Sequence, residues 1–247
     1  MAATSSIIGQ SVPRIDGYPK ITGNAQYVAD LSLPRMLHAA VLRSPHPHAL
    51  LTNIDATEAR KVSGVKAVLT GPDILRMEKI SPFYGPAFRD QPILAVERVR
   101  HVGESVAAVA ADTREAADKA LSLVKVEYEP RPAVHSVLDA IKPDAPLVHE
   151  NLESAKTFAD LAHLEGSNSN INYHFKLRRG DVQTSMSEAA MVFSDDYVSP
   201  PASHAHLEPH GVMAHWDANG KVTVWTSTQS PSLVRNDLAN IYGVPLN

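Results

Sequence analysis

Residues 219–243 constrain the fold of this chain most, because a hairpin signal, a strand pattern and a helix pattern follow one another there without a gap. β-Branched residues alternate along VTVWT (222–226), as they do in a half-buried strand. The Asn219-Gly220 pair just upstream predicts a two-residue hairpin turn. The pattern therefore predicts a β-hairpin over 212–226.

A helix pattern starts immediately after this hairpin. Ser230 is expected to cap the helix, and Pro231 suits its first turn, where a missing N–H is not needed. Gly243 predicts the end of the helix, and Pro245 prevents it from resuming. Gln229 is thus predicted at a strand-to-helix corner, where an amide can point at a ligand and the helix N-terminus favours an anion. The alternative is an ordinary hairpin and helix with no ligand.

The composition is that of an ordinary globular protein. The chain has 247 residues, 44% of them apolar and 20% charged, which suffices for one large or two smaller domains. The net charge of −4 comes from scattered acidic residues, so no nucleic-acid partner is predicted. The absence of cysteine excludes disulfides and thiolate-ligated iron–sulfur clusters from these residues.

The N-terminal residues 1–36 are predicted to form an extended arm, because proline and glycine recur too often for a long helix. The arm either packs along another domain or subunit, or is a loosely attached terminus. It lacks a basic region followed by a long apolar run, and no apolar run in the chain reaches membrane-spanning length. We therefore expect neither an export signal nor a membrane span, and a cytoplasmic location.

The region after the arm is predicted to alternate strands with helices. Strands are expected over 37–43, 66–70, 93–96, 105–110 and 125–128, and a short helix over 57–62. Asp112 and Glu115 form a capping-box pattern at the start of a second helix. The apolar face of that helix consists of Ala116, Ala117, Ala120, Leu121 and Val124. Because strand, helix and strand follow one another closely from 105 to 128, we predict a crossover unit packed on a sheet.

Beyond Pro132 the pattern is less regular. The polar run GSNSNIN (166–172) is typical of a loop or linker, and we place a domain boundary near 135–175. After it, we predict a helix over 182–190, flanked by short strands over 175–177 and 191–198.

One cluster has the spacing of a metal site. On a strand, His204, His206, Glu208 and His210 would share one face, and imidazoles with a carboxylate can bind a first-row metal. Pro209 interrupts such a strand, however, which favours a structural loop over a metal-binding protein.

Other groups of histidines and arginines carry weaker signals. His46 and His48 flank a proline, but two ligands are too few for a metal site, so a structural turn is preferred. Two basic patches could contact a phosphate or an acidic partner, although a solvated edge is the simpler interpretation. They consist of Arg98, Arg100 and His101, and of Arg178 and Arg179. The sequence contains no GxSxG elbow, P-loop or dinucleotide fingerprint, so no bound NAD or ATP is expected.

Several segments, in order along nearly the whole chain, resemble one protein family. They are RIDGYPKITGNAQYVADLSLP (14–34), LHAAVLRSPHPHALLTNID (37–55), GVKAVLTGPDI (64–74), VRHVGESVAAVAADTREAADKALSLVKVEYEP (99–130), LRRGDV (177–182), HAHLEPHGVMAHWD (204–217) and the TSTQSP corner (226–231). Together they are similar to the N-terminal part of the molybdopterin-binding catalytic subunit in the xanthine oxidase/aldehyde oxidase family of molybdenum hydroxylases.

The resemblance implies an α+β fold, with an α/β hammerhead domain followed by the first part of a molybdopterin-binding domain. It implies an extended arm over 1–19, the hammerhead domain over 20–135, a linker over 136–174 and an incomplete cofactor domain over 175–247. The family's Gly-rich segment at the pterin and its glutamate base at molybdenum lie beyond Asn247. We therefore expect a fragment or one half of a split subunit, with apolar surface exposed on 175–247.

The resemblance also implies an activity. The family hydroxylates aldehydes or N-heteroaromatic substrates with oxygen derived from water, and electrons leave molybdenum through iron–sulfur clusters to FAD on partner domains or subunits. Some relatives reduce their substrate instead. The isolated chain is expected to be inactive and to need the remainder of the molybdopterin subunit or a companion chain, an iron–sulfur subunit and an FAD subunit. The alternative is a non-catalytic interaction or assembly subunit that completes a split molybdopterin subunit.

For the site, the resemblance implies that Gln229 hydrogen-bonds the cofactor at molybdenum, with Thr228 and Ser230 as weaker candidates. An amide can donate to a metal-oxo oxygen without adding charge. Glu208, in the LEP segment, is expected to position the chain and not to act as an acid or base. The resemblance implies no catalytic residue and no protein ligand to a metal here, since the pterin dithiolene holds molybdenum in the family.

Overall fold

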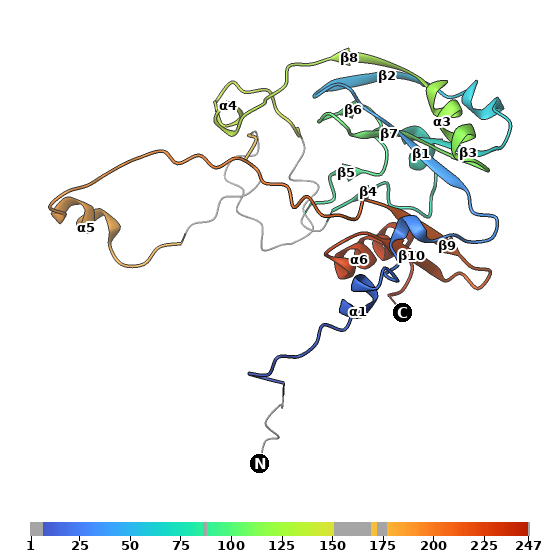
Figure 1. Cartoon of the computed structure of the whole chain (residues 1–247). Coiled ribbons are helices and arrows are strands. Elements are labelled where there is room, and N and C mark those ends of the chain that lie inside the picture. Colours follow the sequence, from blue (N-terminus) through green and yellow to red (C-terminus); the bar gives the residue numbers. More distant parts are fainter. Residues whose placement is uncertain (1–6, 86–87, 151–168, 172–176, 247) are drawn as a thin grey trace. The chain divides into compact units, whose positions relative to one another are not determined.

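The computed structural model describes residues 7–85, 88–150, 169–171 and 177–246 (Figure 1). The chain forms two compact units, and each unit joins two stretches that are distant in the sequence. The smaller unit combines Met1–Pro34 with Val198–Gln229, and the larger combines Arg35–Tyr197 with Ser230–Asn247.

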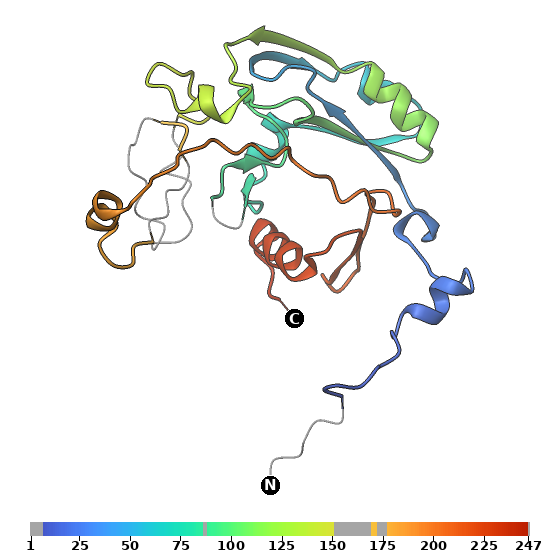
Figure 2. The same ribbon diagram turned by 60° about the vertical axis from the view of Figure 1, so that its left-hand side comes forward.

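The first sheet of the larger unit has β7 (Ser105–Ala111) at its centre, between β1 (His38–Arg43) and β3 (Val65–Thr70). Both pairings are antiparallel, with Val109 opposite Ala40 on one side and Val68 on the other. Helix α3 (Arg114–Ser122) packs on this sheet through its small apolar residues (Figure 2). The predicted apolar face of this helix is confirmed, since each of its five members is buried or packs against the buried cluster.

The second sheet has the order β6-β2-β8 and is also antiparallel. It consists of β2 (Ala49–Asp55), β6 (Arg98–Val99) and β8 (Lys125–Pro130). A small cluster of fully buried side chains joins this sheet to the first one, because Ala49 and Val99 pack with Val106 of β7. The larger unit therefore has two adjoining apolar cores, one under α3 and one between the sheets.

The predicted crossover from 105 to 128 is wrong. β1 and β3 occupy both edges of β7, so no edge remains for the strand that follows α3. That strand, β8, instead pairs with β2 in the other sheet. The β2 strand was not among the predicted elements.

Three further local predictions at the edges of these elements are also wrong. Thr113, not Asp112, caps α3: its hydroxyl oxygen accepts a hydrogen bond from the backbone N–H of Ala116 at 3.1 Å. Residues 93–96 form no strand, and the nearby hairpin is the short pair β4 (Phe83–Tyr84) and β5 (Gln91–Pro92). Residues 191–198 have no regular structure, since no described strand pairs with them.

The remaining elements of the larger unit are short. Two helical turns, η2 (Ala59–Lys61) and α2 (Gly71–Leu75), lie beside the first sheet. The first of them, η2, falls within the helix predicted over 57–62. Helices α4 (Val137–Ala140) and α5 (Val182–Glu188) follow later in the chain, and α5 confirms the helix predicted over 182–190. Residues 175–176, in the other predicted strand, lie outside the described residues.

Helix α6 (Pro231–Tyr242) completes the larger unit. The carbonyl oxygen of Ile241 accepts a hydrogen bond from the backbone N–H of Ser81 at 2.8 Å, which ties the helix to the segment before β4. Pro231 occupies the first turn, and Gly243 ends the helix with a left-handed φ of 62°, both as predicted. Ser230 is the N-cap residue, but its side chain makes no capping hydrogen bond.

The smaller unit contains the hairpin of β9 (Val212–Trp216) and β10 (Val222–Thr226), which confirms the hairpin predicted over 212–226. Its loop differs from the predicted two-residue turn. Three residues separate Asp217 from Lys221, and Gly220 has φ 86°, the left-handed residue of a three-residue hairpin loop. The N-terminal stretch adds α1 (Gly17–Ile21) and the single turn η1 (Val28–Asp30), so it is not wholly extended.

Apolar side chains are exposed along 177–246, as predicted. The more exposed ones include Phe193 at 84%, Tyr197 at 91% and Val198 at 91%, and others lie on α5 and β9. Monomeric proteins seldom leave so many large apolar side chains in water, so this stretch is suited to packing against another polypeptide. In the part of the chain that the structure describes, no helix is both long and apolar enough to cross a bilayer.

Candidate functional site

Gln229 lies where the sequence analysis places it, between the end of β10 and the first turn of α6. Its side chain and that of Thr228 are exposed, whereas Ser230 is half-buried. An exposed amide with two N–H donors and one carbonyl acceptor can contact a polar ligand without adding charge.

The segment before β9 does not form the strand that a shared metal-binding face would need. Residues 204–210 have no regular secondary structure, and Ala205 takes a left-handed φ of 45°. The rings of His206 and His210 stack, with centroids 4.8 Å apart. No group of three or more His, Asp or Glu side chains among the described residues is arranged to hold a metal ion.

Glu208 instead contacts the N-terminal stretch of its own unit. Its Oε1 accepts a hydrogen bond from the backbone N–H of Val28 at 3.2 Å. Gly211, three residues later, lies so close to Val28 that a Cβ there would be 3.1 Å from Cγ1 of that valine. Both observations place Glu208 in a structural contact, consistent with the positioning role expected for it.

The SPHPHA segment also has a structural arrangement. The hydroxyl of Ser44, which is 2% exposed, donates to the carbonyl oxygen of His46, and its oxygen accepts from the backbone N–H of the same residue. The His46 ring packs against Tyr128 of β8, with centroids 4.8 Å apart. His48 Nδ1 lies 2.7 Å from the carbonyl oxygen of Pro132. These contacts anchor the turn between β1 and β2, as a structural turn requires.

The two predicted basic patches differ in their surroundings. Arg178 and Arg179 are exposed. Arg98, by contrast, forms an ion pair with Glu150, and Arg100 is half-buried. Burial lowers the pKa of the Arg100 guanidinium, although it remains protonated at any physiological pH.

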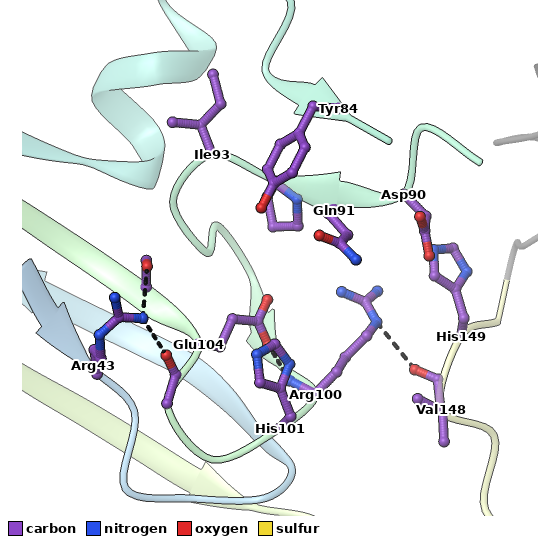
Figure 3. Close-up of a pocket in the computed structure, with 13 residues that line it drawn as sticks. Arg43, Tyr84, Asp90, Gln91, Ile93, Arg100, His101, Glu104, Val148 and His149 are labelled. Atoms are coloured by element: carbon purple, nitrogen blue, oxygen red, sulfur yellow. Dashed lines mark hydrogen bonds and ion pairs between the residues drawn. The ribbon is translucent and has the colours of Figure 1, made fainter. Parts of the chain in front are cut away.

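A cavity of about 410 Å³ in the larger unit was not foreseen from the sequence (Figure 3). It brings together residues from β4, β5, the loop between β6 and β7, and residues 148–149. The only sequence signal for it was the Arg98/Arg100/His101 patch, since two of those residues line it. Gly103, Glu104 and Ser105 follow this patch in the sequence, and the remaining lining residues come from separate segments that no local pattern connects.

Two family models match consecutive parts of the chain. The family model for the "aldehyde oxidase and xanthine dehydrogenase, a/b hammerhead domain" matches residues 22–132. The model for the "molybdopterin cofactor-binding domain" matches residues 163–247. The chain belongs to the molybdenum hydroxylase family. In that family, it corresponds to the N-terminal part of the molybdopterin subunit, as the resemblance implied.

Individual members of the molybdenum hydroxylase family agree with this assignment. A probable xanthine dehydrogenase subunit from Bacillus subtilis is 34% identical over 94% of this chain, which spans 28% of that protein. The nicotinate dehydrogenase large molybdopterin subunit from Eubacterium barkeri is 29% identical over 99% of the chain, which spans 53% of it. The chain thus spans about a quarter to a half of these relatives.

Solved structures of molybdenum hydroxylases show the same fold. Quinoline 2-oxidoreductase from Pseudomonas putida 86 superimposes with a TM-score of 0.79 and 30% identity, covering 96% of this chain and 29% of that one. Aldehyde oxidoreductase from Desulfovibrio gigas superimposes with a TM-score of 0.75 and 26% identity, covering 95% and 25%. The α+β fold, with a hammerhead domain and the start of a cofactor domain, is therefore confirmed.

Proposed function

We propose that this chain forms part of the molybdopterin-binding catalytic subunit of an oxidoreductase that hydroxylates an aldehyde or N-heteroaromatic substrate with water-derived oxygen. The observation that carries the proposal is the pair of consecutive family matches, hammerhead and then cofactor domain, in the order of the relatives. The names of the relatives described above refer to xanthine, nicotinate, quinoline and aldehydes, which are the substrate classes that the proposal covers.

The residues at the end of β10 fit a cofactor-contacting role. Gln229 and Thr228 present uncharged side chains at an exposed corner, directly before a 12-residue helix whose first residue, Pro231, leaves no N–H unsatisfied. An uncharged donor suits a metal-oxo group, because a carboxylate there would repel it. When bound, the molybdenum cofactor supplies the two-electron redox chemistry. In this proposal, Gln229 donates from its amide, while Thr228 and Ser230 help to hold the ligand.

The exposed apolar side chains along 177–246 indicate that the chain must bind a further polypeptide to perform this function. In the proposal, the remainder of the molybdopterin subunit, or a companion chain, covers Phe193, Tyr197 and Val198 and completes the cofactor pocket. A pocket that holds a large cofactor needs convergent groups from several segments. Iron–sulfur clusters are assigned to partner subunits or domains, because the 247 residues contain no cysteine. FAD is assigned to a partner as well, because the sequence has no dinucleotide fingerprint. The domain limits at 19, 135 and 174 and the cytoplasmic location stay predictions.

The proposal is tested by producing the chain with and without the polypeptide that completes the molybdopterin subunit. Molybdenum, pterin and turnover are measured in both preparations, with ¹⁸O-labelled water to trace the inserted oxygen. We expect molybdenum and labelled product only in the completed assembly. Label incorporated from O₂, or a completed assembly without molybdenum, would contradict the proposal.

The exposed apolar stretch also favours the second candidate, a non-catalytic assembly subunit. The same experiment separates the two functions. If the companion alone holds molybdenum and turns over at the full rate, this chain contributes assembly and not part of the site.

A further inference from the structure

The cavity in the larger unit is a polar site with an unusual arginine at its centre. Arg100 follows β6 and extends into the space between Gln91 and Val148 (Figure 3). The cavity volume of about 410 Å³ is within the range of small-molecule sites. All of its lining residues belong to the larger unit, so the site does not depend on how the two units are arranged.

The backbone of Arg100 is fixed, and no described carboxylate pairs directly with its guanidinium, although the charges of Glu104, Glu150 and Asp90 act on it from farther away. Glu104, which is 8% exposed, accepts a hydrogen bond from the backbone N–H of Arg100 at 2.5 Å. The guanidinium donates from Nε to the carbonyl oxygen of Val148 at 3.0 Å. Among the described residues, it forms no ion pair, whereas Arg98 is paired with Glu150. The two Nη atoms therefore carry a partly desolvated positive charge toward the cavity.

A partly buried cation of this kind is stabilised by an anion. Removing a charge from water is unfavourable unless an opposite charge or hydrogen-bond acceptors replace the lost hydration. Burial is the leading cause that lowers the pKa of Arg100, which reflects that lost hydration. The carbonyl oxygen of Val148 replaces only part of it.

The surrounding side chains add neutral donors. The hydroxyl of Tyr84 and the amide of Gln91 line the same cavity. Burial raises the pKa of Tyr84, so its hydroxyl stays protonated and able to donate at neutral pH. Burial and the nearby Arg100 lower the pKa of His149, which disfavours its charged form. Arg43 also lines the cavity, and its Nη1 donates to the carbonyl oxygen of Gly103 at 2.8 Å.

Acidic residues limit the charge that the cavity can accept. Asp90 and Glu104 both line it, and each repels a further negative charge. Both charges of a dianionic phosphate would be repelled by these carboxylates, while a cation would be repelled by Arg100. A single carboxylate matches the planar guanidinium fork and carries only one charge.

We propose that this cavity is a carboxylate-binding site in which the Nη atoms of Arg100 hold the ligand and Tyr84 and Gln91 donate to it. The site lies outside the corner at Gln229, and it does not rest on the proposed molybdenum chemistry. The carboxylate comes either from a small free acid or from an acidic side chain of a bound polypeptide. Glu104 acts as a positioning residue, since it holds the backbone of Arg100.

The test titrates the 247-residue chain with sodium acetate, sodium succinate, N-acetylglutamate amide and inorganic phosphate, with no molybdenum cofactor present. Binding is followed by calorimetry and by the ¹⁵N resonance of the Arg100 Nε–H group, which reports on that residue directly. Preference for acetate or succinate indicates a free acid, and preference for the blocked glutamate indicates a polypeptide side chain.

Variants assign the binding to Arg100. Arg100→Gln is expected to weaken carboxylate binding about tenfold or more, because it removes a charge-assisted pair of hydrogen bonds. Arg100→Lys keeps the charge and the apolar stem but loses the guanidinium fork, so a smaller loss of carboxylate affinity is expected. This variant also provides the test if Arg100→Gln does not fold. Arg114→Gln is the matched control, because Arg114 is exposed on α3 and pairs with Asp118 of the same helix.

Each outcome decides the proposal. Carboxylate binding that is weakened in both Arg100 variants, less in Arg100→Lys than in Arg100→Gln, and kept in the Arg114 variant supports it. Phosphate binding as tight as that of acetate overturns the carboxylate assignment. No Arg100-dependent binding by any probe at concentrations up to about 10 mM overturns the site itself.

Discussion

The carboxylate of Glu208 accepts a hydrogen bond from the backbone N–H of Val28 at 3.2 Å, across 180 residues of sequence. The contact joins the LEP segment to the turn η1 within the smaller unit. Gly211 packs on the same valine, so the N-terminal stretch is held at this point by one polar and one apolar contact.

The contact predicts the effect of changing Glu208. Glu208→Ala should lower the protection of residues 26–31 in hydrogen exchange and destabilise the unit by about 1 kcal/mol, the usual worth of one hydrogen bond. Glu208→Gln should retain most of the protection, because the amide oxygen can still accept from Val28. Equal loss in both variants would show that the negative charge, and not the hydrogen bond, holds the stretch.

The cap of α3 gives a second prediction, which separates two neighbouring residues. Thr113→Ala should lower the free energy of unfolding by about 1 kcal/mol, because the hydroxyl that accepts from the Ala116 N–H is lost. Asp112→Ala should have a smaller effect, because the side chain of Asp112 forms an exposed ion pair with Lys66, at 2.9 Å, and such pairs contribute little. Chemical denaturation of both variants measures the difference. If Asp112→Ala lowered the free energy of unfolding more than Thr113→Ala, Asp112 would be the cap.

The first residue of α2 gives a third prediction. A Cβ on Gly71 would lie 2.1 Å from the carbonyl oxygen of Ala95, which is backbone and cannot move aside. Gly71→Ala should therefore destabilise the larger unit by roughly 3 kcal/mol or more. Gly17→Ala is the control, since a Cβ there meets only Arg14 Cβ at 3.5 Å, an ordinary contact. A thermal melt of each variant compares the two, and a stable Gly71 variant would contradict this packing.

Asp73 predicts how stability depends on pH. Burial alone would raise its pKa, but hydrogen bonds from Thr70 and the charges of Arg60 and Arg76 leave the pKa below its usual value. A lowered folded-state pKa stabilises the protein above the unfolded value of about 3.9, and this stabilisation is lost as the pH falls through the folded value. Asp73→Asn should therefore be less stable than the parent at pH 7, and the gap should narrow below about pH 4.

Denaturant unfolding at a series of pH values measures this gap. Asp118→Asn is the control, since it removes only an exposed ion pair with Arg114 and should change the unfolding free energy little. A gap for Asp73→Asn that stays constant down to about pH 2 would show that ionisation of this carboxyl is not linked to folding.

The local elements with strong end signals could be predicted from the sequence, and those that depend on distant pairing could not. The hairpin and α6 were found because Asn219-Gly220, Pro231 and Gly243 mark their limits. Strand β2 was missed because its pairing with β8 shifts register between Leu51 and Asn53, which breaks the alternation that identifies a strand. The crossover was wrong because the partner of β8 is set by which sheet edges are occupied, and no local pattern carries that information.

The same limit applies to the sites. The corner at Gln229 could be predicted because one continuous segment forms it. The cavity around Arg100 could not, because Tyr84, Gln91 and His149 reach it from separate segments. The face that His204, His206, Glu208 and His210 would share on a strand does not form, because residues 204–210 form no strand, in agreement with the loop that Pro209 favours.

The last prediction concerns Gln229 in the completed enzyme. Gln229→Ala should leave the fold intact, because the side chain is exposed at the corner between β10 and α6. Its effect should fall on turnover, since losing an outer hydrogen bond at a metal site lowers activity on the order of 10–100-fold. Gln229→Glu should be worse, because a carboxylate cannot donate and would repel an oxo group. Asn240→Ala is the matched control, because it removes an exposed amide that lies on α6 itself and not at the corner.

The comparison requires the remainder of the molybdopterin subunit to be present and the molybdenum content of each preparation to be measured. Rates are then expressed per bound molybdenum, so that a loss of cofactor is not mistaken for a loss of turnover. A lower molybdenum content with normal turnover per metal would give Gln229 a role in retaining the cofactor. If both variants match the parent in content and in rate, Gln229 is only a turn residue, because neither the amide donor nor the absence of charge at this corner then matters to the enzyme.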